Sequence, residues 1–382
     1  MIVRESLTRI IVIADKEWTQ IRRDKRSLIL SLFVPSLLVL LFGYALNVDV
    51  KNISIGIYDQ DKGAFARSYI EKFAHTDYLK IKESIERYDA IDYLIDSGKI
   101  IMAVVIPRDF EKRFKSGKPA NVQLLVDGSD STSAMIATGY VKAITLEFNK
   151  DINIMELKKR GIIELKQPVD VRNRIWYNPE LESKNFIIPG LIVLILSIIS
   201  ALITSLTISR EWERGTMETL ITTPVRGGEV VLGKLIPYLF IGIFDVVLGL
   251  CIGYFAFNVP FKGNFIELCL ISFLFLAGTS SLGILISTAT RVQVLSVQVA
   301  IVSTYLPSFI LSNFIFPIQS MPLVIQGITY IVPAKYLIMV IKGIALKGTG
   351  YALLWLQILF LSIFCIIVVA LSIRKFKVTL PG

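Results

Sequence analysis

The sequence is poor in the residues from which most enzyme sites are built. Its 382 residues include one histidine, His75, and three cysteines. A single histidine excludes a multi-histidine metal site and argues against a histidine-dependent catalytic triad. Cys251, Cys269 and Cys365 all fall in long apolar stretches, where a free thiol is a small packing group. The polar part of the chain must therefore fold without disulfide bonds.

Charge is also scarce, and apolar residues take its place. Charged residues make up 19% of the chain and hydrophobic residues 53%, which is apolar for a soluble protein of this length. A helix needs about 20 apolar residues to cross a bilayer. Because lipid forces each spanning segment to satisfy its own backbone hydrogen bonds, we predict a polytopic α-helical membrane protein with six transmembrane helices. The windows are 28–46, 186–208, 235–257, 265–287, 294–316 and 351–373.

Basic residues next to these windows predict the orientation. They cluster before the first window, between the second and third, between the fourth and fifth, and after the last. The positive-inside rule places these segments in the cytoplasm, with both termini, and the rest of the protein in the cell membrane or outside it. The net charge of +10 reflects these loops and requires no nucleic-acid partner. The residues are Arg22, Arg23, Lys25, Arg26, Arg210, Arg214, Arg226, Lys234, Arg291, Arg374, Lys375 and Lys377.

Residues 1–27 form a leader with one apolar helical stripe, which predicts a cytoplasmic interfacial helix. Gly43-Tyr44-Ala45 offers small residues at the spacing of a signal-peptidase site. However, the polar leader is about as long as a whole signal peptide, and the apolar core exceeds the usual length of about 7–15 residues. We therefore interpret 28–46 as an uncleaved first span.

Residues 47–185 have the composition of a soluble domain and alternate between strand and helix patterns. This alternation predicts an α/β domain with a mixed sheet, inserted between spans 1 and 2 and lying outside the cytoplasm. The polar turn from Val126 to Asp130 is interpreted as a turn and helix cap rather than a ligand site. The expected strands are 53–58, 78–81, 102–106, 122–126 and 169–177, and the expected helices 62–73, 84–97, 109–115 and 131–159.

The segment 209–234 is charged and rich in turn residues, although it lies between two spans of the transmembrane region 186–382. Acids near its start and bases near its end suit a short helix at the cytoplasmic face. Such a helix would be a handle by which a partner outside the membrane moves the spans. The candidate contact residues are Arg210, Glu211, Glu213, Arg214, Gly215, Thr216, Glu218, Leu220, Thr223 and Pro224.

Part of this segment has the glycine and lysine spacing of a phosphate-binding loop, from Gly228 to Lys234. The next residue is Leu235, where a hydroxyl should coordinate magnesium, and no apolar strand precedes the glycines. We therefore expect no ATP hydrolysis in this chain.

Asp245 lies near the middle of the third span, where an acid is costly unless it is paired, hydrated or protonated. It is either a substrate, proton or coupling site, or a structural residue that hydrogen-bonds to the hydroxyl row Ser197, Ser200, Thr204 and Ser205. The candidate pathway residues are Asp245, Ser200, Thr204, Gln298, Thr304 and Asn313.

The stretch 317–347 is interrupted by Pro333, Lys335 and Lys342. A further full span here would spoil the topology, so we predict interfacial or re-entrant helices on the outer side. A gating role and a capping role remain open for them.

Four motifs are distributed along the chain. They are Asp15-Lys16-Glu17 … Arg23-Asp24-Lys25-Arg26 with Pro35 and Phe42 to Leu46; Trp176-Tyr177-Asn178-Pro179 before Asn185-Phe186 and Pro189-Gly190; Arg210-Glu211 … Glu213 to Glu218 … Leu220 … Thr223-Pro224 … Glu229 … Gly233-Lys234; and Pro317 … Met321-Pro322 with Pro333. Together these motifs resemble the permease subunit of an ABC-2 type exporter, in the subfamily with a large domain after the first span. The resemblance covers essentially the whole chain.

This resemblance implies that 209–234 contains a coupling helix that docks on a separate ATPase subunit, with the leader helix as a second contact. That partner would use ATP and magnesium, and this chain would bind no cofactor and would not be an enzyme. Two permeases, identical or homologous, would pair, and in some members the outer domain meets a periplasmic adaptor. The exported cargo would be a drug, a lipid or another hydrophobic molecule, taken from the cytoplasm or the inner leaflet.

Two other functions stay open from the residues alone. A membrane-anchored receptor or assembly protein would use the outer domain but leave the charged segment 209–234 without a task. An ion-coupled secondary transporter would use Asp245, work without an ATPase, and lose transport when Asp245 is replaced by asparagine.

Overall fold

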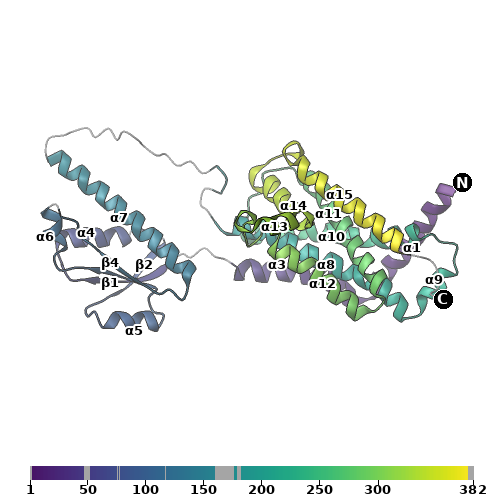
Figure 1. Ribbon diagram of the computed structural model, residues 1–382, viewed down its shortest axis with the longest axis horizontal. Helices are drawn as coiled ribbons and strands as arrows, with labels where there is room; N and C mark the ends of the chain where they lie inside the picture. Colours follow the sequence, from purple (N-terminus) through teal and green to yellow (C-terminus); the bar gives the residue numbers. More distant parts are fainter. Residues whose placement is uncertain are drawn as a thin grey trace. The chain divides into compact units, whose positions relative to one another are not determined.

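The computed structural model describes residues 2–46, 52–74, 76, 78–116, 118–159, 176–178 and 182–376 (Figure 1). The chain divides into two compact units. Unit 1 consists of Met1–Val48 and Arg174–Gly382, and unit 2 of Asp49–Asn173. Each unit has its own hydrophobic core.

Unit 2 contains a four-stranded sheet with the strand order β2-β1-β3-β4. Strand β1 (Ile53–Asp59) pairs in parallel with β2 (Leu79–Ser84) and β3 (Met102–Ile106), and β4 (Gln123–Val126) pairs antiparallel to β3. All five residues of β3 are buried, as in a strand covered on both faces. The sheet is mixed, and its central strands carry the apolar runs that the sequence presents as strands.

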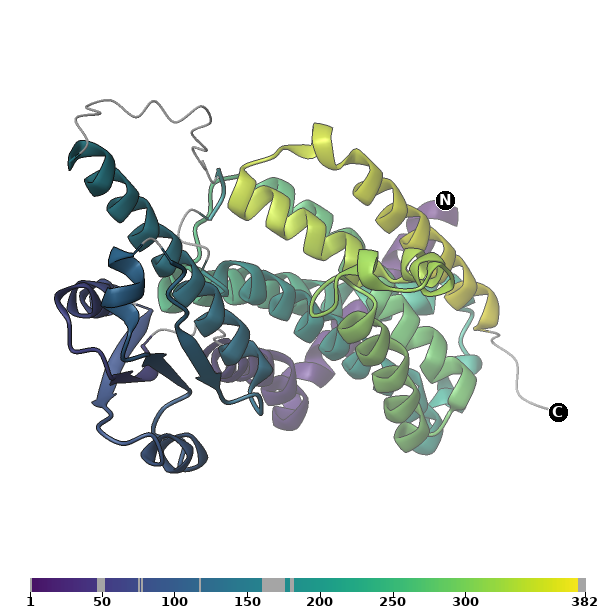
Figure 2. The same cartoon turned by 60° about the vertical axis from the view of Figure 1, so that its left-hand side comes forward.

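Helices cover both faces of this sheet. α5 (Ala90–Asp96) packs with Ile100, Ala103 and Val105 on one face. The helices α4 (Ala64–Ala74), α6 (Phe110–Lys115) and α7 (Ser131–Lys159) pack on the other, where they form the larger core (Figures 1 and 2). Unit 2 is therefore a three-layer α/β structure.

The largest difference between sequence prediction and structure in unit 2 concerns one helix. The helix expected over 84–97 begins only at Ala90, because β2 continues to Ser84 and the Ile85 N–H then donates to the carbonyl of Ile57. The alternation of exposed lysines with more buried residues in β2 is the two-residue period of a strand. Most of the strand expected over 169–177 lies outside the described residues.

Unit 1 is helical, and α8 (Lys184–Glu213) is its central element. α8 packs against α3 (Val34–Ala45), α10 (Gly227–Phe257), α11 (Phe265–Thr290) and α12 (Gln293–Ile310), and most of its residues are buried. At Gly283 of α11, an added Cβ would lie 2.4 Å from the carbonyl oxygen of Ala201. This glycine therefore permits the close approach of α11 to α8.

Among the described residues, five helices are long and apolar enough to cross a membrane, namely α8, α10, α11, α12 and α15 (Tyr351–Lys375). A sixth candidate is the pair Leu323–Ile331 and Pro333–Lys347, which is bent by 80° and contains α13 (Leu323–Ile328) and α14 (Pro333–Ile341). The chain is thus a multi-pass membrane protein, and its described part contains five or six apolar spans by length and composition.

The first and fifth predicted spans are shorter than expected. Before α3 the backbone forms a π-helix, Ile29–Phe33, because Pro35 has no N–H to donate to the preceding turn. The apolar helix that remains is Ser31–Ala45. α12 ends at Ile310 rather than 316, because Asn313 adopts a left-handed conformation and accepts a hydrogen bond from the Ile318 N–H.

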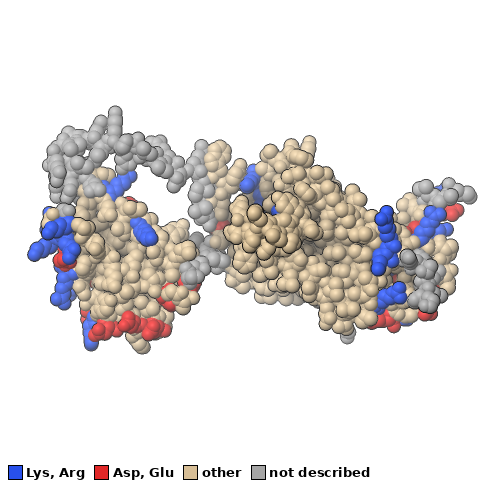
Figure 3. All heavy atoms as spheres, viewed as in Figure 1, with Lys and Arg blue, Asp and Glu red and all other residues tan. Residues whose placement is uncertain are grey.

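The remaining elements of unit 1 lie at the two ends of the bundle. They are α1 (Ile2–Arg23), α2 (Lys25–Leu28), α9 (Thr216–Ile221), and the short turns Ile318–Ser320, Thr329–Ile331 and Lys342–Lys347. Lysine and arginine side chains gather at the end of unit 1 where α9 and the last turn of α15 lie (Figures 1 and 3).

Candidate coupling site at the elbow between α8 and α10

The chain reverses direction between α8 and α10 in an elbow that we define as residues 214–226. α8 continues through Glu213, and Gly215 follows with a φ of 69°. This left-handed conformation favours glycine and ends the long helix. The six residues of α9 come next, and α10 begins at Gly227. The predicted short helix is therefore present as α9, but Arg210, Glu211 and Glu213 belong to α8.

Lys234 lies within α10 and is buried in an ion-pair network. Its side chain is 2% exposed, and its Nζ lies 3.0 Å from Glu17 Oε2 and 3.1 Å from Glu211 Oε1. Tyr238 donates a hydrogen bond to the other oxygen of Glu17 at 3.0 Å, and Lys16 contacts Glu211 at 3.0 Å. The network ties α1, α8 and α10 together. The spacing from Gly228 to Lys234 is thus part of a helix, not a phosphate-binding loop.

Arg210 makes a further contact between α8 and the start of the chain. Its guanidinium lies 3.2 Å from the carboxylate of Asp24. Arg210 and Glu211, both candidate partner-binding residues, are therefore engaged inside the chain and stabilise the position of α1.

The first half of α1 contacts the elbow itself. Arg9 donates a hydrogen bond to the carbonyl of Pro224 at 2.6 Å, and Ser6 donates to Glu229 Oε1 at 2.5 Å. The Arg226 N–H donates to Glu229 Oε2 at 2.9 Å, which caps the start of α10. The predicted interfacial leader is therefore packed on the elbow and on α10.

Glu213 links the end of α8 to the start of α12. Its carboxylate accepts hydrogen bonds from the backbone N–H of Gln293, at 2.7 Å, and from the Gln293 side chain. A carboxylate is favourable at a helix N-terminus, where free N–H groups and the helix dipole meet. Arg291 stacks over Trp212 nearby, with the guanidinium carbon 4.7 Å from the ring centre. Glu213 is exposed, but its carboxylate already accepts hydrogen bonds from the first residue of α12.

The rest of the elbow faces outward. Met217 is 1% exposed and anchors α9 in the core, with Leu220 half-buried beside it. Within the described part of the chain, neither Arg214 nor Glu218 forms an ion pair. The exposed candidates are Arg214, Gly215, Thr216, Glu218, Thr223 and Pro224. An anchored short helix with free charges of both signs is suited to bind a protein partner.

The candidate pathway residues do not share one surface. Ser200 donates to Thr279 at 2.9 Å, which joins α8 to α11, and Thr204 donates to the Ser200 carbonyl in its own helix. Thr304 is buried and bonds within α12, whereas Gln298 is exposed on the same helix. The Ser200 hydroxyl therefore stabilises the contact between α8 and α11, and the hydroxyls of Thr204 and Thr304 bond to backbone carbonyls of their own helices.

Asp245 is 5% exposed, and its Oδ1 has no hydrogen-bond partner within the described residues. The hydroxyl groups of the row on α8 bond to other partners. Ser197 bonds to Ser308, and Ser205 donates to a carbonyl of its own helix. No hydrogen bond joins Asp245 to this row within the described residues, so the structural alternative for Asp245 gains no support from these hydroxyls. Asn313, the sixth candidate, shapes the turn after α12.

Comparison with known proteins gives matches along nearly the whole chain. The family described as ABC-2 family transporter protein matches residues 25–374. The chain is 36% identical over 373 residues to the probable multidrug ABC transporter permease YbhS of Escherichia coli K12, covering 97% of both chains. It is 30% identical over 348 residues to the probable multidrug ABC transporter permease YbhR of the same strain, covering 88% of this chain and 92% of that one. With the inner membrane transport permease YhhJ of Escherichia coli K12 it shares 26% identity over 310 residues, 80% of each chain.

Proposed function

Because this chain belongs to the ABC-2 transporter family and is a permease subunit of an ABC exporter, we propose that it exports hydrophobic or amphipathic molecules, drug-like or lipid-like, from the cytoplasm or the inner leaflet. Membership of this family implies an ATPase partner and a dimeric arrangement. The proposed class of cargo is supported by the full-length similarity to two permeases that are named for multidrug transport.

The ATPase contact is proposed to be the exposed face of the elbow. Glu218 and Arg214 are its charged residues that form no ion pair with the described residues, and Glu213 lies next to them at the end of α8. ATP and magnesium would be bound and used by the partner. Nucleotide binding shifts the permease only if the partner contacts this face differently in its two states.

The ion-pair network would transmit a force at this contact to the helices in the membrane. Glu17, Glu211 and Lys234 tie α1, α8 and α10 together next to the elbow, so a force on α9 would move these helices as a group. The apolar side chains of Leu7, Ile11 and Val12 on α1 are more than half exposed and would form the second contact with the ATPase.

The proposed orientation places α9 and both termini in the cytoplasm and unit 2 outside it. The gathering of lysine and arginine at the α9 end of unit 1 supports this orientation (Figure 3). At the opposite end, an added Cβ on Gly43 of α3 would lie 2.9 Å from Ile188 in the first turns of α8. The chain therefore leaves and re-enters unit 1 at that end, and unit 2 would be positioned to meet an adaptor protein.

The dimer contact is proposed to involve α12. Gln298 is exposed there among Val294, Leu295, Val299 and Val302, which are also exposed. An amide that faces lipid is costly, whereas amides that meet across a helix pair satisfy one another. A second permease, identical or homologous, would cover this face.

Replacement of Gln298 by cysteine tests this contact. We expect a bismaleimide of short span to produce a crosslinked species of about twice the mass of one permease, because the two α12 helices would approach each other. Leu353→Cys on α15, which is 74% exposed, is the matched control and should stay monomeric. Equal crosslinking at both positions would exclude a specific α12 contact.

Transport itself distinguishes the exporter from an ion-coupled carrier. In vesicles that hold this chain and its ATPase, we expect ATP to drive efflux of fluorescent amphipathic dyes with all ion gradients collapsed. Asp245→Asn keeps the size of the side chain and should change this efflux less than about twofold, since no proton on Asp245 is needed. Efflux that needs an ion gradient and is lost in Asp245→Asn would support the carrier instead.

A further inference from the structure

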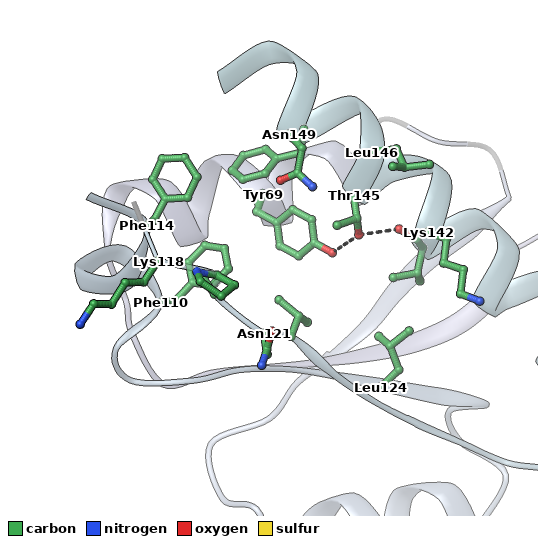
Figure 4. A pocket seen from close by; sticks show the side chains of 15 residues that line it. Tyr69, Phe110, Phe114, Lys118, Asn121, Leu124, Lys142, Thr145, Leu146 and Asn149 are labelled. Carbon is green, nitrogen blue, oxygen red and sulfur yellow. Dashed lines mark hydrogen bonds between the residues drawn. The ribbon is translucent and has the colours of Figure 1, made fainter. Parts of the chain in front are cut away.

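Unit 2 contains a cavity of about 750 Å³ between α7, α6 and the segment that leads into β4 (Figure 4). This volume is in the range of small-molecule sites in proteins. All the residues that line the cavity belong to unit 2, and none belongs to the elbow or to a membrane-spanning helix. Nothing in the proposed transport mechanism uses it.

The inner wall of the cavity is aromatic and aliphatic. The ring centres of Tyr69 and Phe148 lie 5.0 Å apart, and those of Tyr69 and Phe110 lie 6.1 Å apart in a stacked arrangement. Leu124 of β4 also lines the cavity. Leu146 of α7 lines it as well and is 69% exposed. These surfaces favour a planar or branched apolar group.

The two hydroxyl groups inside the cavity already donate their protons in hydrogen bonds within unit 2. Thr145 donates to the Val141 carbonyl at 2.7 Å, so Tyr69 must donate to Thr145, at 2.6 Å (Figure 4). Burial raises the pKa of Tyr69, so this hydroxyl stays protonated at neutral pH. The interior therefore offers no free hydroxyl proton to a charged ligand group.

The rim of the cavity is cationic. Lys118 and Lys142 are exposed and flank the cavity from opposite sides, and Asn121 and Asn149 add amide groups (Figure 4). None of the 15 lining residues is acidic. Two acids of α7 that are close in sequence, Glu147 and Asp151, instead pair with Lys72 of α4. An anion at the rim is therefore attracted by the two lysines and is not repelled by any acidic residue of the lining.

We propose that this cavity binds an amphipathic organic anion, with its apolar body against Tyr69, Phe110 and Leu124 and its carboxylate, sulfonate or phosphate group at the rim near Lys118 or Lys142. The apolar lining supplies affinity, and the rim selects the charge. A peptide segment of a partner protein is the other possible occupant, and the probes below distinguish it.

The test uses the full chain in nanodiscs of zwitterionic lipid, with empty nanodiscs subtracted. Equilibrium dialysis compares 2-naphthalenesulfonate with the neutral 2-naphthalenesulfonamide, which has nearly the same shape. We expect saturable binding of one sulfonate per chain, about three- to tenfold tighter than the sulfonamide, with the preference reduced at high salt. No nucleotide or ATPase is present, so failure here leaves the proposed transport function untouched.

Three variants assign the binding to this cavity. Leu146→Trp narrows the entrance and should weaken both probes at least about tenfold. Lys118→Ala combined with Lys142→Ala should remove only the preference for the sulfonate, and Lys150→Ala, also exposed on α7 but outside the lining, should change nothing. All these positions are exposed, so the fold should persist, as circular dichroism would show.

Three results would overturn the proposal. Absence of saturable binding would favour a peptide occupant. Equal affinity for the two probes would show that the cavity does not select an anion. Wild-type binding by Leu146→Trp would place the site elsewhere.

Discussion

Replacing Lys234 by methionine is expected to destabilise the junction of α1, α8 and α10 by about 3–5 kcal/mol, the largest stability effect of any single change proposed for this protein. The Lys234 ammonium is 2% exposed and lies between Glu17 and Glu211, which are also buried. Removing it leaves two carboxylates in an apolar environment with fewer partners. Thermal unfolding of the purified chain, followed by fluorescence-detected size exclusion, measures the loss.

A rescue variant separates lost charge compensation from lost packing. Lys234→Met together with Glu17→Gln and Glu211→Gln removes the stranded charges, and replacement of a complete buried network is often nearly neutral. We expect this triple variant to recover most of the lost stability. Lys375→Met, at an exposed position of α15, is the matched control and should behave like wild type. If Lys234→Met alone unfolds at the wild-type temperature, the network does not hold the junction.

Reversing the charge of Glu218 is expected to lower ATP-driven export at least about tenfold while leaving expression and membrane insertion unchanged. Glu218 is exposed on α9, so its substitution disturbs no internal contact. A lysine at this position would face the basic group of the partner that Glu218 is proposed to contact, and two like charges across an interface cost up to several kcal/mol. Export by inside-out vesicles that contain the ATPase gives the readout. The expected loss lies in transport per folded permease.

Glu86→Lys provides the matched control, because it makes the same charge change at an exposed position of unit 2. It should export at the wild-type rate. Glu218→Gln should lose less than Glu218→Lys, since it removes an attraction without adding repulsion. Wild-type export by Glu218→Lys would remove Glu218 from the proposed contact.

The elements that sequence predicts best are those with a strong local pattern. The apolar runs around Ile195, Val246 and Phe275 correspond to α8, α10 and α11, because lipid-length hydrophobicity identifies a span without tertiary information. The buried run Met102–Ile106 likewise corresponds to a strand. Helix ends were less predictable. α8 runs to Glu213, since charged residues at the end of a helix tolerate either helix or loop.

The arrangement of the site depends on contacts that no local pattern carries. Lys234 and Glu17 are 217 positions apart in the chain, and their pairing exists only because α1 packs against α10. Without that contact, Glu211 looks like a surface charge similar to Glu218. The same limit explains Asp245, whose neighbours depend on which faces of α8 and α11 meet α10.

Affinity purification of the tagged chain in mild detergent, with mass spectrometry of the proteins that remain bound, tests the central claim most directly. A permease driven through its elbow should retain a P-loop ATPase, and the Glu218→Lys chain should lose it while keeping the second permease. A wild-type chain that purifies without any ATPase in several detergents would contradict the proposed coupling.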